Sequence, residues 1–419
     1  MQTERSCPEC GISIVKDGRY PAWCPSCEWN LSEPPRKRSL GVALTDRLTA
    51  GQHAQVLRRG ARVSGGGASR VLSSVLAALI HLLAAGSAVA GVWIAVILPN
   101  FVGWALAALL LGAAWLMRPR FGRLARTAPV LTRESAPRLF GLLDRVGAEV
   151  GAAKVDTVLV TAEFNASYGQ IGLRGRRLLC LGAPLWAMLE PQERIALLAH
   201  ELSHSSNGDI RHSRLANTAL AGLDAVRRAT RGAAETGEES AEAAGQSIAS
   251  LALLVLIIVM RLAGFAIGLL GFLLLITTTR SARQAEYVAD ERAARVASSG
   301  AAAAMLDKLA TAPVDLNELS WLSATLGTTV WRRLTERQAQ LPAHELERRR
   351  RLMAREPRHF ADSHPPLDLR VEFVRSLGHD TAAVRLRDLE DEAVQAELEP
   401  RFAEIAEELG AARREVSFA

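Results

Sequence analysis

One long stretch of this sequence carries no charged side chain. Residues 71–117, 47 in all, contain no Asp, Glu, Lys or Arg. A helix that crosses a lipid bilayer needs about 20 apolar residues, so this stretch has room for two crossings, divided at Leu98-Pro99-Asn100. The sequence therefore predicts a transmembrane helical hairpin at 71–117, and with it a mainly α-helical membrane protein.

Arginines flank this hairpin on both sides, which bears on its topology. Because basic flanks of membrane helices remain in the cytoplasm, we expect a multi-pass protein of the cell membrane with a cytoplasmic N-terminus. Membrane topology then explains the net charge of +6, and we do not expect binding to nucleic acid. The flanking residues are Arg58, Arg59, Arg62, Arg70, Arg118, Arg120, Arg123 and Arg126.

Four of the five cysteines form two CxxC motifs, Cys7–Cys10 and Cys24–Cys27, separated by 13 residues. Four thiolates from two such turns can enclose one tetrahedral zinc ion, and this spacing is typical of a small zinc ribbon. Two disulfides in a secreted domain are the alternative, but the N-terminal MQTERSCPEC lacks the apolar core of a secretion signal. We therefore expect a structural zinc, which holds together a segment too small for a core of its own.

The segment RIALLAHELSH contains the spacing His200-Glu201-x-x-His204. Residues four apart lie on the same face of a helix, so the two imidazoles can bind one metal ion, with Glu201 beside them and within reach of a zinc-bound water. The alternative, an exposed helix with scattered histidines, disagrees with the apolar residues around the motif. Burying two imidazoles and a carboxylate without a partner would be costly.

Two histidines do not complete a catalytic zinc site, which takes three protein ligands and a water. Candidates for the third lie in RSARQAEYVADERAARV, directly after a second apolar run at 248–279. Glu286 could coordinate the metal, and Asp290 could accept a hydrogen bond from a ligating histidine and fix its tautomer. An ExxxD pattern in a charged helix is more often a solvated face, so it is the position after the apolar run that favours a metal site.

Several sequence elements occur together in one order. They are FNASYGQ at 164–170, HELSHSSNGD at 200–209, the second apolar run, EYVAD at 286–290 and SHPPLDLRVEFVR at 363–375. In this combination the chain resembles the HtpX-like and CAAX prenyl protease family of integral-membrane zinc metallopeptidases. The resemblance covers residues 131–375 and the preceding hairpin, but not the zinc ribbon. It implies a zincin-type α+β metallopeptidase domain.

The resemblance also implies a role for each residue of the metal site. It makes His200, His204 and Glu286 the zinc ligands. It makes Glu201 the general base and Asp290 a hydrogen-bond partner of the ligands.

Four further residues receive roles in the same way. His364 and Arg370 become candidates for contacts with the substrate or its oxyanion, although a histidine before two prolines could also be an ordinary loop residue. Asn165 and Ala166 match an edge-strand element of the family. This match implies that an extended peptide substrate pairs with the chain there.

A zinc ion shared by His204 and Glu286 also constrains the topology, because the chain between them must cross the bilayer an even number of times. A single crossing by 248–279 would put Glu286 on the wrong side. Either this segment is re-entrant or bent and turns near Arg261, or residues 210–231 supply a partner crossing, although they are short of apolar residues.

These features divide the chain into six segments, and a loop rich in Ala, Gly and Glu is expected at 227–246. The segments are a zinc ribbon at 1–33, a linker and amphipathic helix at 34–70 (the linker's proline-and-charge run begins at the end of the ribbon and spans 32–39), the transmembrane hairpin at 71–117, a first part of the metallopeptidase domain with the HExxH motif at 118–246, a membrane segment at 247–280 that is long, bent or re-entrant, and a second part of the metallopeptidase domain with the third zinc ligand at 281–419.

We therefore expect a membrane-embedded zinc-dependent endopeptidase with one catalytic and one structural zinc. Its active site should face the cytoplasm and its substrates should be polypeptides, above all membrane proteins in quality control, while a protein partner of the ribbon stays open. The alternative is a membrane-tethered binding module, whose ribbon holds a protein or nucleic acid while the protease-like part serves as a scaffold. The metal content separates the two hypotheses, because the enzyme needs two zinc ions per chain and the module needs one.

Overall fold

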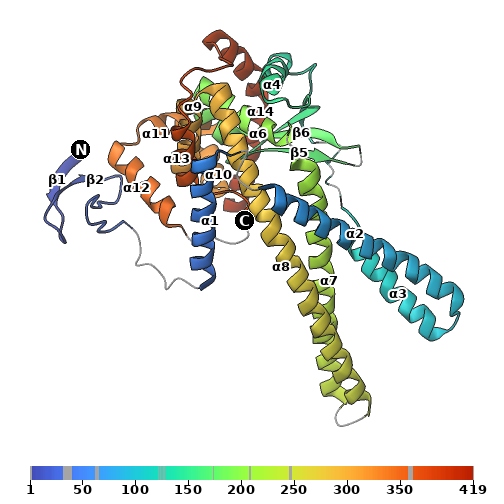
Figure 1. Ribbon diagram of the computed structural model, residues 1–419. Coiled ribbons are helices and arrows are strands. Elements are labelled where there is room, and N and C mark those ends of the chain that lie inside the picture. Colours follow the sequence, from blue (N-terminus) through green and yellow to red (C-terminus); the bar gives the residue numbers. More distant parts are fainter. Residues whose placement is uncertain are drawn as a thin grey trace. The chain divides into compact units, whose positions relative to one another are not determined.

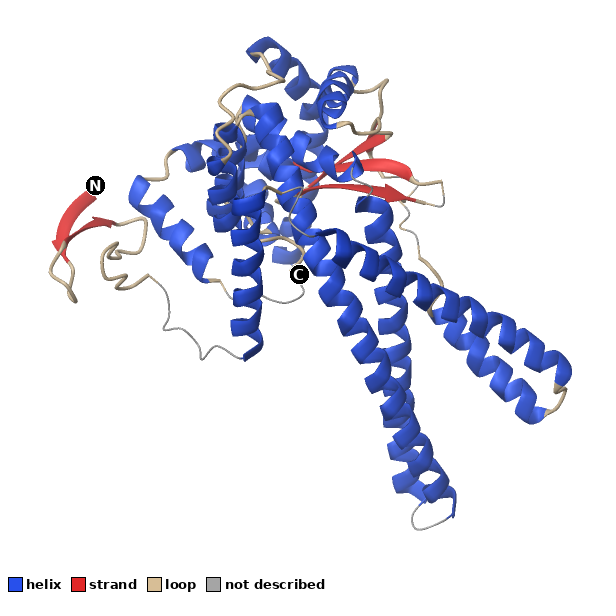
Figure 2. Cartoon of the chain, viewed as in Figure 1, coloured by secondary structure: helices blue, strands red, loops and turns tan. Residues whose placement is uncertain are grey.

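The computed structural model of the chain describes residues 2–31, 40–61, 66–120, 122, 124–125, 128–172, 174–206, 209–244, 248–356 and 362–418. The predicted linker at 32–39 lies outside the described residues. The rest is mainly helical, with two small sheets (Figure 2). Contacts divide the chain into two units, one made of Met1–Ser64, Gly122–Asn207 and Gln284–Ala419, the other of Gly65–Phe121 and Gly208–Arg283.

The first unit begins with the four-cysteine segment. Strands β1 (Gln2–Ser6) and β2 (Ser13–Asp17) form an antiparallel hairpin. The buried core beside it consists of Cys7, Ile14 and Cys24. Because so small a core cannot offset the loss of chain entropy on folding, this segment needs another source of stability.

Part of that stability comes from packing on helix α12 (Ala343–Arg355). Trp23 Nε1 donates a hydrogen bond to a backbone carbonyl at the start of α12 at 3.1 Å. Arg351 Nη1 of α12 donates to the carbonyl of Pro25 at 2.6 Å and lies 3.5 Å from a carboxylate oxygen of Glu28. All three ribbon residues lie in or next to the second CxxC motif, so that motif forms the docking surface.

A four-stranded sheet of order β3-β4-β6-β5 also belongs to the first unit. Its strands are β3 (Val130–Leu131), β4 (Thr157–Thr161), β5 (Ala166–Ile171) and β6 (Arg176–Gly182). β4 and β6 are parallel, whereas β5 pairs antiparallel with β6. Within the described residues, β5 is therefore an edge strand.

Helices make up the rest of this unit, and two ion pairs with little exposure hold the helix that carries the HExxH motif, α6 (Pro191–Ser206). Arg194 Nη1 lies 2.6 Å from Asp391, and Lys308 Nζ lies 2.7 Å from Glu193. The other helices are α1 (Leu40–Arg59), α4 (Pro137–Val150), α5 (Ala183–Met188), α9 (Ser299–Thr311), α10 (Leu316–Leu326), the 3₁₀ turn η1 (Gly327–Thr329), α11 (Val330–Ala339), α13 (Leu367–Ser376) and α14 (Asp388–Phe418).

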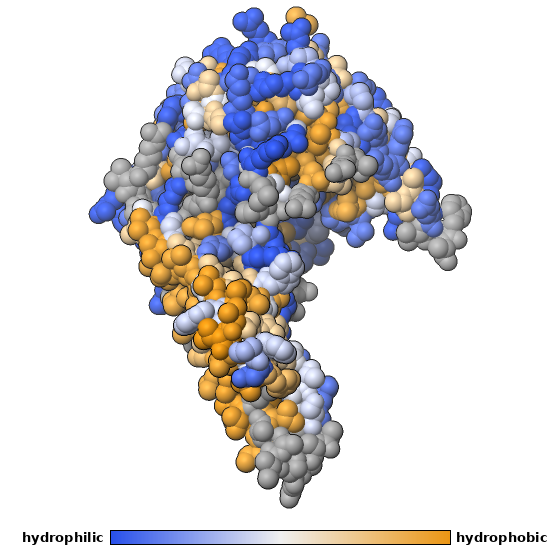
Figure 3. Space-filling view, turned by 90° about the vertical axis from the view of Figure 1, so that its right-hand side faces the viewer, coloured by the Kyte–Doolittle hydropathy of each residue, from blue (hydrophilic) through white to orange (hydrophobic). Residues whose placement is uncertain are grey.

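The second unit consists of long helices: α2 (Gly66–Ile97), α3 (Phe101–Leu116), α7 (Asp209–Ala244) and the first part of α8 (Ile248–Ala297). By length and composition alone, Gly67–Ile97 and Leu253–Ala297 could each cross a membrane, and Phe101–Leu116 is a shorter apolar helix. Figure 3 shows apolar side chains gathered over these long helices. The side chain of Asn100 caps α3 by accepting a hydrogen bond from the backbone of Gly103, so the two helices of the predicted hairpin meet there.

These helices share an apolar core and a partly buried polar contact. The ring of His81, on α2, has its Nε2 3.2 Å from the carbonyl oxygen of Leu215 and 3.1 Å from the hydroxyl of Thr218, both on α7. Because its ring nitrogen has hydrogen-bond partners on the neighbouring helix, the polar side chain of His81 can lie among apolar residues. The core residues are Ala77, Ile80, Ala84, Met117, Ala219, Leu223 and Leu274.

Helices α7 and α8 run antiparallel beside each other (Figure 1). Glycines permit their close approach, since a Cβ at Gly264 would lie 3.1 Å from Thr230 Oγ1 and a Cβ at Gly237 would lie 3.1 Å from Ile257. α8 continues through Arg261 without a break over its 50 residues. α8 therefore does not turn near Arg261, and residues 210–231 lie in the helix α7; a second crossing of the bilayer by that segment stays a prediction.

The loop predicted at 227–246 is wrong over residues 227–244, which continue α7 as a helix. Alanine, arginine and glutamate are strong helix formers, and Arg231 and Glu235 form an i,i+4 ion pair on the exposed face. Gly237 contributes to packing rather than to a turn, because it lies against Ile257. At Gly237, therefore, the absence of a side chain reflects contact with α8.

Candidate metal centre

Helix α6 presents His200, Glu201 and His204 from within the first unit. Pro191 is its first residue, where the missing backbone N–H costs nothing. The side chain of Glu193 accepts a hydrogen bond from the backbone N–H of Glu190 at 2.8 Å, which satisfies a donor at the helix start. The helix is buried along most of its length, including His200 at 5% and Glu201 at 8% exposure.

The structure brings the three predicted zinc ligands together. The ligand atoms of His200, His204 and Glu286 all lie within 4.8 Å of one another. His200 Nε2 lies 3.4 Å from Glu286 Oε2, and His204 Nε2 lies 3.4 Å from Glu286 Oε1. Each imidazole therefore faces one oxygen of the same carboxylate, which is the donor set of a catalytic zinc site with three protein ligands.

A bound cation would also satisfy an atom that is otherwise poorly served. Among the described residues, the buried Oε2 of Glu286 accepts no hydrogen bond of acceptable geometry, although His364 Nδ1 lies 2.9 Å and Arg370 Nη1 3.2 Å away. Buried carboxylate oxygens are normally hydrogen-bonded or bound to a metal. The residues present thus fit a zinc ion.

Asp290 and Arg370 lie directly behind the ligands. Asp290 Oδ1 is 3.0 Å from His200 Nδ1, and both oxygens of Asp290 accept hydrogen bonds from the Arg370 guanidinium, at 2.7 and 2.8 Å. A carboxylate that accepts the Nδ1–H of His200 leaves Nε2 free to face a metal ion. Arg370 is only 4% exposed, and its Nη2 also lies 3.4 Å from both ring nitrogens of His200.

Burial and these charges shift the pKa values of the α6 side chains in different directions. Burial opposes protonation of His200, but the adjacent carboxylates of Asp290 and Glu286 outweigh it and raise its pKa to about 10. Burial lowers the pKa of His204 to about 4 and raises that of Glu201 to about 7. A zinc ion must therefore displace a proton from His200, because metal ligands are neutral imidazoles.

The remaining predicted residues lie at the borders of this region. His364 is 66% exposed and reaches Glu286 from the loop before α13. Asn165 is exposed and Ala166 is buried at the start of the edge strand β5, which packs on α6. The roles of these residues, like that of Arg370, stay predictions.

No sequence motif indicates the contact between α1 and α8, the helix that carries Glu286. His53 of α1 is buried and hydrogen-bonds to Tyr287, the neighbour of Glu286. The sequence indicates only an amphipathic helix here, and the one available signal is a polar stripe of Thr45, Thr49 and His53 at four-residue spacing.

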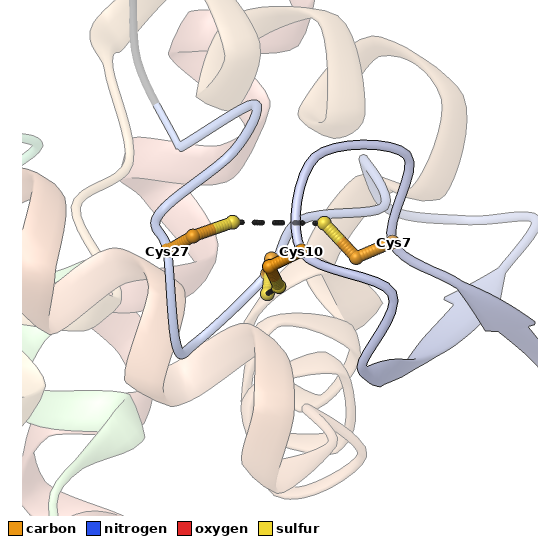
Figure 4. Close-up of side chains that lie close together, drawn as sticks. Cys7, Cys10 and Cys27 are labelled. Carbon is orange, nitrogen blue, oxygen red and sulfur yellow. Dashed lines mark hydrogen bonds between the residues drawn. The ribbon is translucent and has the colours of Figure 1, made fainter.

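The four cysteines of the N-terminal segment form a second cluster. Figure 4 labels three of them, Cys7, Cys10 and Cys27. The four sulfur atoms lie within 4.8 Å of one another, with Cys7 and Cys27 3.6 Å and Cys10 and Cys24 3.5 Å apart. All four are free, so the alternative of two disulfides is not observed. Backbone N–H groups, that of Cys27 foremost, lower the pKa of Cys24 to about 6 against the effect of burial, which favours the thiolate that binds zinc.

Comparisons with known proteins agree with this geometry. The family model described as Peptidase family M48 matches residues 142–377. The chain is also 30% identical over 105 residues to Protease HtpX homolog 1 of Streptomyces coelicolor, an alignment that covers 25% of this chain and 34% of that protein. The chain thus spans about a third of the length of the curated relative it matches. No solved structure matches it.

Proposed function

The chain belongs to peptidase family M48, and on this premise we propose that it is a zinc-dependent endopeptidase. The observation that carries the proposal is the cluster of His200, His204 and Glu286, whose ligand atoms lie within 4.8 Å of one another. Glu201 lies one residue from His200 on the same helix and is equally buried. This is the arrangement of a metal site with an adjacent general base.

A zinc ion bound by these residues would lower the pKa of a water molecule and polarise the peptide carbonyl. The chain supplies the proton transfers. The carboxylate of Glu201 accepts the proton of the attacking water and returns it to the nitrogen of the leaving amine. Burial supports this role, because it raises the pKa of Glu201 to about 7, near the pH at which a proton is both taken and returned.

The substrate is proposed to bind as an extended strand along β5. An exposed sheet edge offers unpaired backbone groups to a peptide, and β5 begins at the predicted Asn165–Ala166 element and packs on α6. This pairing recognises the backbone of a polypeptide and leaves the choice of sequence to its side chains.

The two candidate residues of the 363–375 element, His364 and Arg370, are proposed to have different tasks. His364 is mostly exposed beside the ligands, which suits contact with a substrate carbonyl or its oxyanion. Arg370 is buried and binds Asp290 with two parallel hydrogen bonds. Its contacts favour a role in holding the ligands over direct contact with substrate.

We assign the enzyme to the cell membrane, with its N-terminus and active site on the cytoplasmic side and with membrane proteins in quality control as its substrates. Two apolar helices of sufficient length support the membrane, and the relative named Protease HtpX homolog 1 supports this class of enzyme. The arginines on both flanks of 71–117 support the orientation.

The four cysteines are proposed to hold a structural zinc that shapes the surface docked on α12. Trp23, Pro25 and Glu28 surround the second CxxC motif and make the contacts to that helix. This use of the ribbon within the chain supports the enzyme over the alternative of a free binding module.

The test is Glu201→Gln in detergent-purified protein, with casein as substrate and Glu149→Gln, an exposed change on α4, as the matched control. We expect two zinc ions per chain in all three proteins and a fall in cleavage of about 10²- to 10⁴-fold for Glu201→Gln alone. Unchanged cleavage by Glu201→Gln, or one zinc per chain in the wild type, would contradict the proposal.

A further inference from the structure

Helix α1 lies outside the residues matched by the family model, yet it buries an unusual set of side chains. Thr45, Thr49 and His53 recur every four residues and are 2%, 2% and 6% exposed. Residues at this spacing share one helix face. Polar groups are buried at a cost unless they are hydrogen-bonded, so the partners of this face determine its purpose.

Both ring nitrogens of His53 have partners. Nδ1 lies 3.1 Å from the hydroxyl of Tyr287 on α8, and Nε2 lies 3.2 Å from a carboxylate oxygen of Glu372 on α13. A carboxylate only accepts hydrogen bonds, so Nε2 carries a hydrogen and donates it to Glu372, while Nδ1 shares a hydrogen bond with the tyrosine hydroxyl. The imidazole thereby connects two helices that are far apart in sequence.

The surroundings make this connection tight. Tyr287 and Phe373 are 1% and 2% exposed, and their rings meet edge to face with centroids 5.3 Å apart. The ring of His53 packs on Tyr287 from α1, at 5.9 Å. Because such an interior is close-packed, a shift of one of these rings moves the others.

The two connected helices carry the part of the metal centre that α6 does not supply. α8 brings Glu286, the neighbour of Tyr287, together with Asp290, while α13 brings Arg370, two residues before Glu372. The distances between Arg370 and the two carboxylates, 3.2 Å to Glu286 and 2.7 Å to Asp290, depend on how α8 and α13 lie against each other.

We propose that His53 is a positioning residue of the metal centre: by bridging Tyr287 and Glu372, it holds α8 and α13 in the register at which Glu286 faces the two histidines. The inference rests on the proposed zinc site. It assigns α1, which precedes the first apolar helix, a task in the active site that the residues of the peptidase family model do not include.

The test compares His53→Ala and His53→Gln for the affinity of the catalytic zinc, kcat and KM. Replacing a direct hydrogen-bond partner of a ligand typically costs 10- to 100-fold in metal affinity, and His53 acts one layer further out. We expect His53→Ala to weaken zinc binding and lower kcat by about 3- to 10-fold each, with KM within about twofold. His53→Gln should restore most of both, because its amide can donate to Glu372 and accept from Tyr287.

Three further variants keep the test decisive. Glu372→Ala removes one partner of His53 from a side chain that is 60% exposed, so it probes the same bridge at little risk to folding. Leu57→Ala changes an exposed residue of the same helix and should alter neither quantity. Glu286→Ala removes a ligand of the catalytic site and leaves the four-cysteine cluster as the complete zinc site, so this variant provides the baseline for zinc bound at the ribbon.

A purely structural role of His53 would lower the melting temperature while zinc affinity and kcat of the folded protein stay at wild-type values in both His53→Ala and Glu372→Ala. That result would overturn the proposal. Zinc affinity is measured by competition with a chelator and needs no turnover. If the wild type binds two zinc ions but cleaves nothing, the proposed function fails while the positioning role is still tested.

Discussion

Replacement of Arg370 by lysine tests how the metal centre is held. The guanidinium donates to both oxygens of Asp290, at 2.7 and 2.8 Å, and lies 3.2 Å from Glu286. Burial opposes its charge, yet the carboxylates of Asp290 and Glu286 outweigh burial and raise the pKa of Arg370, so it stays protonated. Lysine keeps the charge but places its donors on one nitrogen, which cannot bind both oxygens of a carboxylate in parallel.

The loss of one charge-assisted hydrogen bond in Arg370→Lys should lower the free energy of unfolding by about 1.5–3 kcal/mol. Arg370→Met should cost more, about 3–5 kcal/mol, because it leaves two carboxylates buried without their cation. In both variants Asp290 holds His200 less firmly, and we expect zinc affinity to fall by about 10- to 100-fold, which equals about 1.4–2.7 kcal/mol.

The assays are denaturant unfolding, zinc affinity by chelator competition, and casein cleavage. Arg375→Lys, an exposed change on the same helix, is the matched control and should behave as the wild type. The reasoning is refuted if Arg370→Lys binds zinc and cleaves casein as the wild type does. It is equally refuted if Arg370→Met proves no less stable than Arg370→Lys.

Three further predictions concern the supports of the fold. Glu28→Lys should expose the ribbon to limited proteolysis, because it places a cation against two arginines of α12, whereas Glu9→Lys, an exposed change in the first CxxC motif, should not. Burial opposes the ionisation of Glu345, but two arginines of α12 outweigh burial and lower its pKa. The stability that the ionised Glu345 contributes is therefore fully present above its pKa in the unfolded chain, about 4.3, and is lost as the pH falls through its lower pKa in the folded protein. Glu345→Gln should therefore flatten the acid limb of the unfolding free energy. His81→Leu should cost about 1 kcal/mol in the free energy of unfolding in detergent, and a further Thr218→Val change should add little, since both changes remove the same His81–Thr218 contact.

The sequence predicts the chemistry of this protein well because that chemistry depends on local spacing. Two histidines four residues apart need only a helix to meet, and two CxxC motifs need only two turns. Glu286 is a longer inference, since it lies on another helix, but its place after an apolar run and the match to a family motif identify it. The division of the first apolar stretch near Asn100 is predictable because a proline and a capping asparagine end and begin helices.

What the sequence predicts poorly depends on contacts between distant segments. Residues 227–244 look like a loop because they are rich in small residues, and the packing of Gly237 against Ile257 shows that one of these residues serves a helix contact instead of a turn. The parallel pairing of β4 with β6 follows from no local pattern. His53 is identical in sequence terms to any polar residue of an exposed helix, until tertiary structure buries it.

The residues that hold the histidine helix in place and those that hold the helices of Glu286 and Arg370 come from different parts of the chain. Helix α6, with both histidines, is held by ion pairs to Asp391 of α14 and Lys308 of α9, and these partners follow the motif in sequence. The helices that bring the third ligand and Arg370 are instead bridged by His53, from an N-terminal helix that the family model does not cover. A metal site whose ligands follow a family pattern therefore depends here on a residue outside it. Because close-packed helices transmit small displacements, a change in α1 should alter the position of Glu286 while leaving the two histidines in place.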